Sequence, residues 1–393
     1  MVSEKEVENM AREFFVPGSI LTGTGALESA KNTLKRMGKK ALIVTDPMMV
    51  ELGNCGKVEQ VLTDAGIPFS VFSSITGEPT DVMVKEGLAR YQSEGCDFLV
   101  GLGGGSPLDT MKSIGVLASD GGDDITVYMG REITAKVPPM VAIPTTAGTG
   151  SEATQFSIIN DTKNHVKMLL KGKVMLPELA IVDPQFTMTA PPKVTVNTGL
   201  DALCHAVEAY TSRKAQTMSD VFAVSAVKRI FKYLPVAFKD GKNEEARVEM
   251  SIAALEAGIA FNNASVTLIH GMSRPIGALF HIAHGMSNAI LMNVCLRFAV
   301  SGAYDRFGRL GREIGAAGAG DDDQTAAEKF LAALDSLTAE LQAPTLASAG
   351  VNKEEFLGYV DKMAHDAMVS GSPQNTMRDM TVEDVKELYR QLW

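Results

Sequence analysis

The sequence predicts an α/β domain followed by an all-helical domain, with residues 1–188 in the first and residues 189–393 in the second. A chain of 393 residues is longer than a single hydrophobic core usually supports, which favours two domains over one. In the first half, short β-branched runs alternate with helical patterns, as in a sheet covered by helices. After the segment "PQFTMTAPPKVT" at 184–195, strand signals almost disappear and helical patterns follow one another.

Four buried strands are predicted in the first domain, with helices between and after them. The strands are 40–46, 68–74, 97–105 and 140–146, and the helices lie near 25–37, 52–66, 81–95 and 107–118. The runs "FSIINDTKNHVKMLL" and "PELAIVD" add extended pieces up to about residue 183. Because strands that alternate with helices form βαβ units, we expect a parallel sheet with right-handed crossovers.

The second domain is predicted to consist of helices alone, since its apolar residues recur at helical spacing. The expected helices are 199–212, 217–238, 243–262, 264–280, 284–300, 302–315, 324–342, 353–369 and 381–392. The glycine-rich patch "GAAGAGDDDQ" at 315–324 interrupts this series as a solvated loop.

Composition excludes several classes of protein. A formal net charge of −10 argues against nucleic acid or an anionic membrane surface as a partner, because both bind basic patches. No apolar run is long enough to span a bilayer, and the start "MVSEKEVENMAREFF" lacks the apolar segment of a signal peptide. The four cysteines are scattered without a CxxC motif, which is typical of free thiols in a reducing compartment. We therefore expect a cytoplasmic protein.

Two loops of small residues predict a nucleotide site. "GLGGGSPLDTMK" at 101–112 follows a strand and opens a helix, so its backbone N–H groups can approach a pyrophosphate at the helix N-terminus. It is not the usual GxGxxG fingerprint, and a tight turn without a ligand is the alternative interpretation. "PTTAGTGSEAT" at 144–154 is a second such loop after another strand. Two of these loops after parallel strands favour a ligand.

Two charged residues of this domain have both a functional and a structural interpretation. Asp46 ends the strand "ALIVTD", where a carboxylate can bind the hydroxyls of an adenosine ribose and repel a 2′-phosphate. It is equally well placed to cap the following helix. Lys167 can reach a ribose or a phosphate, or it is a solvated lysine.

The second domain contains a candidate metal site. Asp201 and His205 are four residues apart, which places a carboxylate and an imidazole on one helix face. His270, His281 and His284 lie within one short window, although the chain has only six histidines. An Asp-His-His-His set suits Fe(II), Zn(II) or a similar divalent ion and needs no thiolate. A hydrogen-bonded Asp–His pair and a cluster of core histidines remain the structural alternatives.

Together these motifs resemble the iron-dependent (group III) alcohol dehydrogenases over nearly the whole chain. The resemblance is carried by "FFVPGSILTGTGAL", "LGGGSPLD", "PTTAGTGSEAT", "LDALCHAVEAY" and "HGMSRPIGALFHIAHG". It implies a dehydroquinate-synthase-like pair of domains with the active site between them. It also implies that the metal ligands are Asp201, His205, His270 and His284. The implied NAD site comprises Asp46, Gly103, Gly104, Gly105, Ser106, Asp109, Thr145, Thr146, Thr149 and Lys167.

The activity implied by the resemblance is reversible hydride transfer between NAD(H) and a small primary alcohol or aldehyde, with the metal as Lewis acid. Family members are commonly dimers or larger homo-oligomers. A glycerol-dehydrogenase-like enzyme is a rival on the same fold, but such enzymes use three protein ligands. A non-catalytic NAD- or metal-binding redox sensor is the rival from another class.

The sequence departs from the family pattern at Arg274 and His281. Many members carry a histidine four residues after the third ligand, close to the nicotinamide, and several have Asn where this chain has His281. A guanidinium cannot relay protons near neutral pH, but it can bind a carboxylate or sulfonate through two hydrogen bonds. Arg274 therefore has two interpretations. It binds an anionic short-chain aldehyde, such as a semialdehyde or sulfoaldehyde, as the substrate of the enzyme, or it forms a structural ion pair. His281 would then supply the titratable group for proton transfer.

Overall fold

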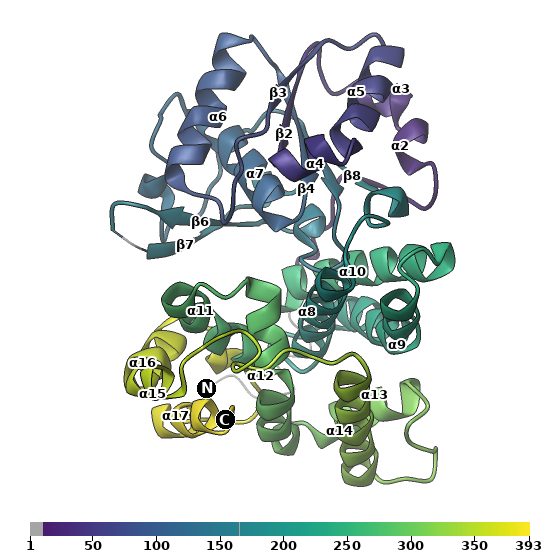
Figure 1. The fold of residues 1–393 in the computed structure, drawn as a ribbon, viewed down its shortest axis with the longest axis vertical. Helices are drawn as coiled ribbons and strands as arrows, with labels where there is room; N and C mark the ends of the chain where they lie inside the picture. Colours follow the sequence, from purple (N-terminus) through teal and green to yellow (C-terminus); the bar gives the residue numbers. More distant parts are fainter. Residues whose placement is uncertain (1–10, 165) are drawn as a thin grey trace.

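The protein folds into an α/β part and a helical part, as Figure 1 shows. The computed structural model describes residues 11–164 and 166–393. Residues 1–10, on which the expectation about a signal peptide partly depends, lie outside the described residues. The expected division of the chain at 188/189 falls between the 3-10 turn η4 (Pro184–Phe186) and helix α8 (Pro192–Tyr210), and it stays a prediction.

A six-stranded sheet forms the centre of the α/β part, in the order β1-β8-β5-β4-β2-β3 with every neighbouring pair parallel. Its strands are β1 (Ser19–Thr22), β2 (Ala41–Thr45), β3 (Phe69–Phe72), β4 (Phe98–Gly103), β5 (Met140–Pro144) and β8 (Leu179–Val182). The predicted parallel sheet is confirmed. Edge strand β1 was not predicted, because its four residues form a strand only by pairing with β8, far away in the chain.

Both faces of this sheet are buried, as a parallel sheet requires. In β2, Leu42 and Val44 pack into the core on one face, and Ala41 and Ile43 pack into the core on the other. The helices of this part are α2 (Ala26–Ser29), α3 (Lys31–Leu34), α4 (Pro47–Glu51), α5 (Asn54–Asp64), α6 (Asp81–Ser93) and α7 (Gly105–Asp120). The helix expected at 25–37 is therefore two short helices. An antiparallel pair, β6 (Phe156–Asp161) and β7 (Val166–Lys171), lies outside the main sheet.

The described residues after β8 form helices and short 3-10 turns with no strand beyond one isolated bridge, Ser212 to Thr376, which confirms the expected all-helical half. Besides α8, the helices are α9 (Thr217–Lys239), α10 (Glu244–Ala264), α11 (Leu268–Phe280), α12 (His284–Ala299), α13 (Tyr304–Glu313), α14 (Asp323–Glu340), α15 (Lys353–Gly358), α16 (Val360–Val369) and α17 (Val382–Arg390). Helix α8 begins earlier than the predicted residue 199, because Pro192 is well suited to the first turn of a helix.

The second small-residue loop is fixed against helix α10. A Cβ added to Gly258 would lie 2.9 Å from the Gly150 Cα, so the two backbones touch only because both residues are glycine. Beside this contact, the Asn262 side chain accepts a hydrogen bond of 2.9 Å from the backbone N–H of Gln155. The loop therefore has a defined position between the sheet and the helical part.

No single helix in the described part of the chain is long and apolar enough to cross a membrane, although α10 and α11, bent by 103°, pass that test as a pair. All four cysteines are free, as expected, and all four are buried.

Candidate metal and nucleotide site

Three helices bring the predicted metal ligands together. Asp201 and His205 lie one turn apart on α8, His270 lies in the first turn of α11, and His284 is the first residue of α12. One ligand atom from each of the four lies within 4.8 Å of all the others. The structural alternative of an isolated Asp–His pair does not describe this arrangement, because four potential ligands from three helices converge on one point.

The charge states of three of these residues, His284, His270 and Asp201, suit a metal. Burial lowers the pKa of His284 to about 3 and the pKa of His270 well below its ordinary value. For Asp201, burial alone would raise the pKa, but the three nearby histidines outweigh it and the pKa is lowered. Neutral imidazoles and an ionised carboxylate are the forms that bind divalent metals.

One contact of His205 supports the same conclusion. Its ring stacks on Phe261, with centroids 4.2 Å apart and an interplanar angle of 17°, which fixes its plane. Its Nδ1 atom is buried and has no hydrogen-bond partner among the described residues. Buried polar atoms are rarely left without a partner. The donor set therefore fits Fe(II) or Zn(II).

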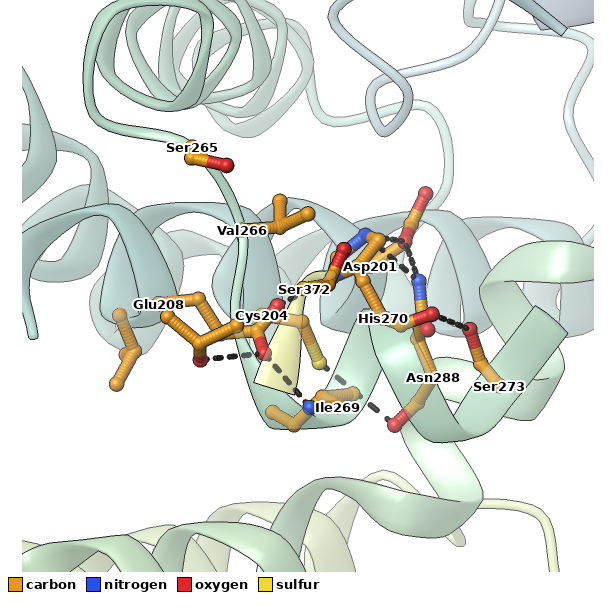
Figure 2. A network of polar contacts seen from close by, with 12 residues as sticks. Asp201, Cys204, Glu208, Ser265, Val266, Ile269, His270, Ser273, Asn288 and Ser372 are labelled. Carbon is orange, nitrogen blue, oxygen red and sulfur yellow. Dashed lines mark hydrogen bonds and ion pairs between the residues drawn. The ribbon is translucent and has the colours of Figure 1, made fainter. Parts of the chain in front are cut away.

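Glu208 holds the His270 ring, and sequence reasoning missed it. This fully buried carboxylate accepts hydrogen bonds of 2.7 Å from both the Thr267 hydroxyl and the Ile269 backbone N–H. Its second oxygen contacts His270 Nδ1, as part of the network in Figure 2. A proton on Nδ1 leaves Nε2 of His270 for the metal. The available signal was its position three residues after His205, inside an apolar helical run.

Asn288 is the second residue that sequence reasoning missed. Its amide nitrogen lies 2.6 Å from Asp201 Oδ1, 3.0 Å from His270 Nε2 and 3.2 Å from His284 Nε2. It follows His284 by one turn of α12, so it shares a helix face with that ligand. Asn288 thus links the ligands of all three helices.

We expect Glu208→Gln to weaken metal affinity by about tenfold or more, because orienting carboxylates behind ligating histidines carry effects of that size. Glutamine keeps the size of the side chain but removes the charge that orders His270, Thr267 and Ile269. The metal dissociation constant, measured by competition with a chelator, checks this expectation. Glu256→Gln on α10 is the matched control, since Glu256 contacts Ser225 and Arg229 instead. Equal metal affinity in Glu208→Gln and the unmutated protein would contradict the assignment.

The two small-residue loops face each other at the carboxyl ends of β4 and β5. Gly104 is the N-cap of α7 and offers no side-chain cap, so the first N–H groups of that helix are free to bind an anion. A Cβ on Gly105 would lie 3.3 Å from the Thr149 side chain, and one on Gly104 would lie 3.6 Å from Thr146 Oγ1. Thr146 Oγ1 is buried without a hydrogen-bond partner among the described residues. The loops therefore fit a bound pyrophosphate.

Ser106 and Gly103 complete the first loop. Gly103 has φ 152°, and a Cβ there would lie 2.4 Å from the Pro107 ring, so this position requires glycine. Ser106 lies in the first turn of α7, and the backbone N–H of Thr145 donates to the carbonyl oxygen of Gly103 at 3.0 Å. The two loops are thus joined to each other.

The Asp109 carboxylate is hydrogen-bonded to other residues of the chain in this structure. Its carboxylate accepts hydrogen bonds from the Ser151 hydroxyl at 2.7 Å and from the Ile158 backbone N–H at 2.9 Å. The buried Lys112 lies close by, with its pKa lowered by burial to about 8, and it donates to Ser151 Oγ at 3.0 Å. Asp109 therefore anchors the second loop, and its contact with a cofactor stays a prediction.

Lys167 and Asp46 each have a protein partner. Lys167 Nζ forms an ion pair of 2.6 Å with Glu78, and it lies close enough to His284 to help lower the pKa of that histidine. Asp46 accepts a hydrogen bond of 2.9 Å from the Met49 backbone N–H as the N-cap of α4. The capping interpretation of Asp46 is thus confirmed, while its role toward a ribose stays a prediction.

The structure separates the two residues at which the sequence departs from the family pattern. Arg274 is half-buried one turn after His270, and its Nη1 donates to Ser372 Oγ at 3.0 Å. His281 is the exposed, left-handed C-cap of α11 with φ 53°, and it does not belong to the ligand cluster. Proton transfer by His281 stays a prediction.

Comparison with known proteins supports the same chemistry. A family model described as iron-containing alcohol dehydrogenase matches residues 17–184, and the C-terminal model of the Fe-containing alcohol dehydrogenase family matches residues 195–393. The NAD-dependent methanol dehydrogenase of Bacillus methanolicus is 36% identical over 380 residues, covering 96% of this chain and 98% of its own.

Two solved structures are similar over almost the whole chain. The crystal structure of a 1,3-propanediol oxidoreductase has a TM-score of 0.94 and 34% identity, covering 98% of this chain and 100% of its own. The sulfoacetaldehyde reductase of Bifidobacterium kashiwanohense in complex with NAD+ has a TM-score of 0.87 and 27% identity, covering 98% of this chain and 99% of its own.

Proposed function

Because this chain belongs to the iron-containing alcohol dehydrogenase family, we propose that it transfers a hydride between NAD(H) and a small primary alcohol or aldehyde. The observation that carries the proposal is the convergence of Asp201, His205, His270 and His284 within 4.8 Å. These four residues would hold one divalent metal, with Fe(II) as the family's metal and Zn(II) as an alternative.

When bound, the metal supplies Lewis-acid stabilisation of charge on the substrate oxygen, and the nicotinamide exchanges the hydride. The chain's own residues bind and orient. Glu208 keeps the Nε2 atom of His270 turned toward the other ligands, and Asn288 links the three helices. The loops at 103–106 and 145–149 would bind the pyrophosphate at the start of α7. The ligand cluster is largely buried, and this burial limits the access of water to the reacting groups.

The relatives support a small substrate. Their names refer to methanol, 1,3-propanediol and sulfoacetaldehyde, and all three are short-chain compounds. Membership of an oxidoreductase family and a complete ligand set argue against a non-catalytic redox sensor. Assembly into a homodimer or a larger homo-oligomer stays a prediction.

A reductase assay tests the proposal. Protein loaded with Fe(II) or Zn(II) is given NADH and a panel of short aldehydes, and NADH oxidation is followed at several pH values. We expect metal-dependent turnover of at least one aldehyde, abolished by a chelator and restored by the metal. A fully metal-loaded protein that binds NADH but reduces no aldehyde and oxidises no short alcohol would contradict the proposal.

A further inference from the structure

Arg274 places a positive charge beside the metal ligands. It follows His270 by four residues on α11, so the two side chains lie on the same face of the helix. The Arg274 guanidinium therefore lies beside the ligand cluster.

This charge has no counter-ion in the described part of the chain. The side chain makes one hydrogen bond, to the neutral hydroxyl of Ser372, and forms no ion pair. Burial lowers the pKa of Arg274, and the carboxylate of Glu208 opposes this effect from beyond ion-pair distance. An arginine stays protonated in a protein, and a partly buried cation without a partner is unfavourable. The structural ion pair predicted as an alternative is therefore not formed among residues 11–164 and 166–393.

The charge balance of the site strengthens this point. A divalent metal would be offset by at most two carboxylates, Asp201 and Glu208, since the other ligands are neutral histidines. Arg274 then adds a positive charge that no nearby carboxylate neutralises. The other nearby cation, Lys167, is already paired with Glu78. A ligand that brings its own negative charge would complete this balance.

The hydrogen-bond donors of Arg274 and Ser372 fit such an anionic ligand. A guanidinium presents its N–H groups as a planar fork, which matches two oxygens of a carboxylate or sulfonate. Only one of these N–H groups is used by a protein acceptor among the described residues. Ser372 Oγ accepts that hydrogen bond, so its own O–H remains able to donate to the same anion.

We propose that Arg274 and Ser372 bind the anionic tail of a short-chain aldehyde whose carbonyl group would be polarised by a metal held by the four ligands. The inference rests on the proposed function and narrows it to substrates that carry a carboxylate or sulfonate. In this arrangement Arg274 determines which substrates are preferred. The four metal ligands keep the roles described above.

The experiment compares two aldehydes with the same four-carbon chain. Succinic semialdehyde carries a carboxylate and butanal does not, and kcat/KM is measured for both with metal-loaded protein and NADH. We expect the unmutated protein to prefer succinic semialdehyde. In Arg274→Gln, the ratio of the two constants should fall about ten- to a hundredfold, as for loss of a charged hydrogen-bonding partner. Arg274→Lys should restore part of the ratio, because a point charge replaces the fork.

A matched variant and two binding measurements separate the alternatives. Arg297→Gln removes an exposed arginine of α12 that pairs with Asp335, and we expect it to leave the ratio unchanged. Metal content and the NADH dissociation constant are measured in every variant. If Arg274→Gln instead weakens metal or NADH binding and affects both aldehydes equally, Arg274 serves the metal or the cofactor and the inference is overturned.

A preference for butanal that Arg274→Gln leaves unchanged would also overturn the inference, while the proposed function would stand. Failure of the unmutated, metal-loaded protein to reduce either aldehyde, or any other in the panel, would count against the proposed function itself.

Discussion

Replacing His270 by alanine is expected to remove the metal and the activity together, with kcat/KM lowered by roughly a thousandfold or more. A metal Lewis acid contributes several kcal/mol to transition-state stabilisation, and each 1.36 kcal/mol is about tenfold in rate. His270 is one of the four converging ligands, and its loss also leaves Glu208 buried without its imidazole partner. Metal content by mass spectrometry and kcat/KM with a short aldehyde check the expectation. His284→Ala should behave in the same way.

A second histidine distinguishes this effect from a general loss of stability. His365 is exposed on α16 and lies outside the ligand cluster, so His365→Ala should keep both metal and activity. Circular dichroism of each variant reports whether the fold is retained. Normal metal content with full activity in His270→Ala or His284→Ala would contradict the assignment of that residue as a metal ligand.

The metal cluster was predictable in part from local periodicity. Four residues make about one helical turn, so Asp201 and His205 had to share a face once the segment was helical. Spacing alone could not bring His270 and His284 to the same point, because that depends on how α11 and α12 pack against α8. For these two residues, the family resemblance supplied the assignment.

The partners of the ligands were beyond local sequence reasoning. Glu208 contacts residues that begin α11, and Asn288 reaches Asp201 across two helices. Glu78, the ion-pair partner of Lys167, comes from a loop far from it in the chain. None of these contacts follows from helical or strand spacing, since each forms only when separate elements pack together. The same reason explains the unpredicted edge strand β1, which pairs with β8.

Replacing Asp46 by asparagine is expected to narrow the preference for NAD over NADP by about ten- to a hundredfold, equivalent to about 1–3 kcal/mol. Asp46 follows β2 at the carboxyl edge of the sheet, where ligands bind in open α/β sheets. A carboxylate there can accept hydrogen bonds from both ribose hydroxyls and repel a 2′-phosphate. Asparagine removes the charge but keeps an oxygen for the hydrogen bond from the Met49 backbone N–H. The ratio of kcat/KM values for NADH and NADPH measures the change.

The choice of asparagine follows from the double role of Asp46 in the structure. Glycine or alanine would remove the cap of α4 together with the charge, and the two effects could not be separated. Asp322→Asn provides the matched control, because Asp322 caps α14 in the helical part through the Thr325 backbone N–H at 2.7 Å. Both substitutions should cost little stability, since asparagine caps helices about as well as aspartate. Only Asp46→Asn should change the cofactor ratio, and equal use of NADH and NADPH by the unmutated protein would leave Asp46 as a helix cap alone.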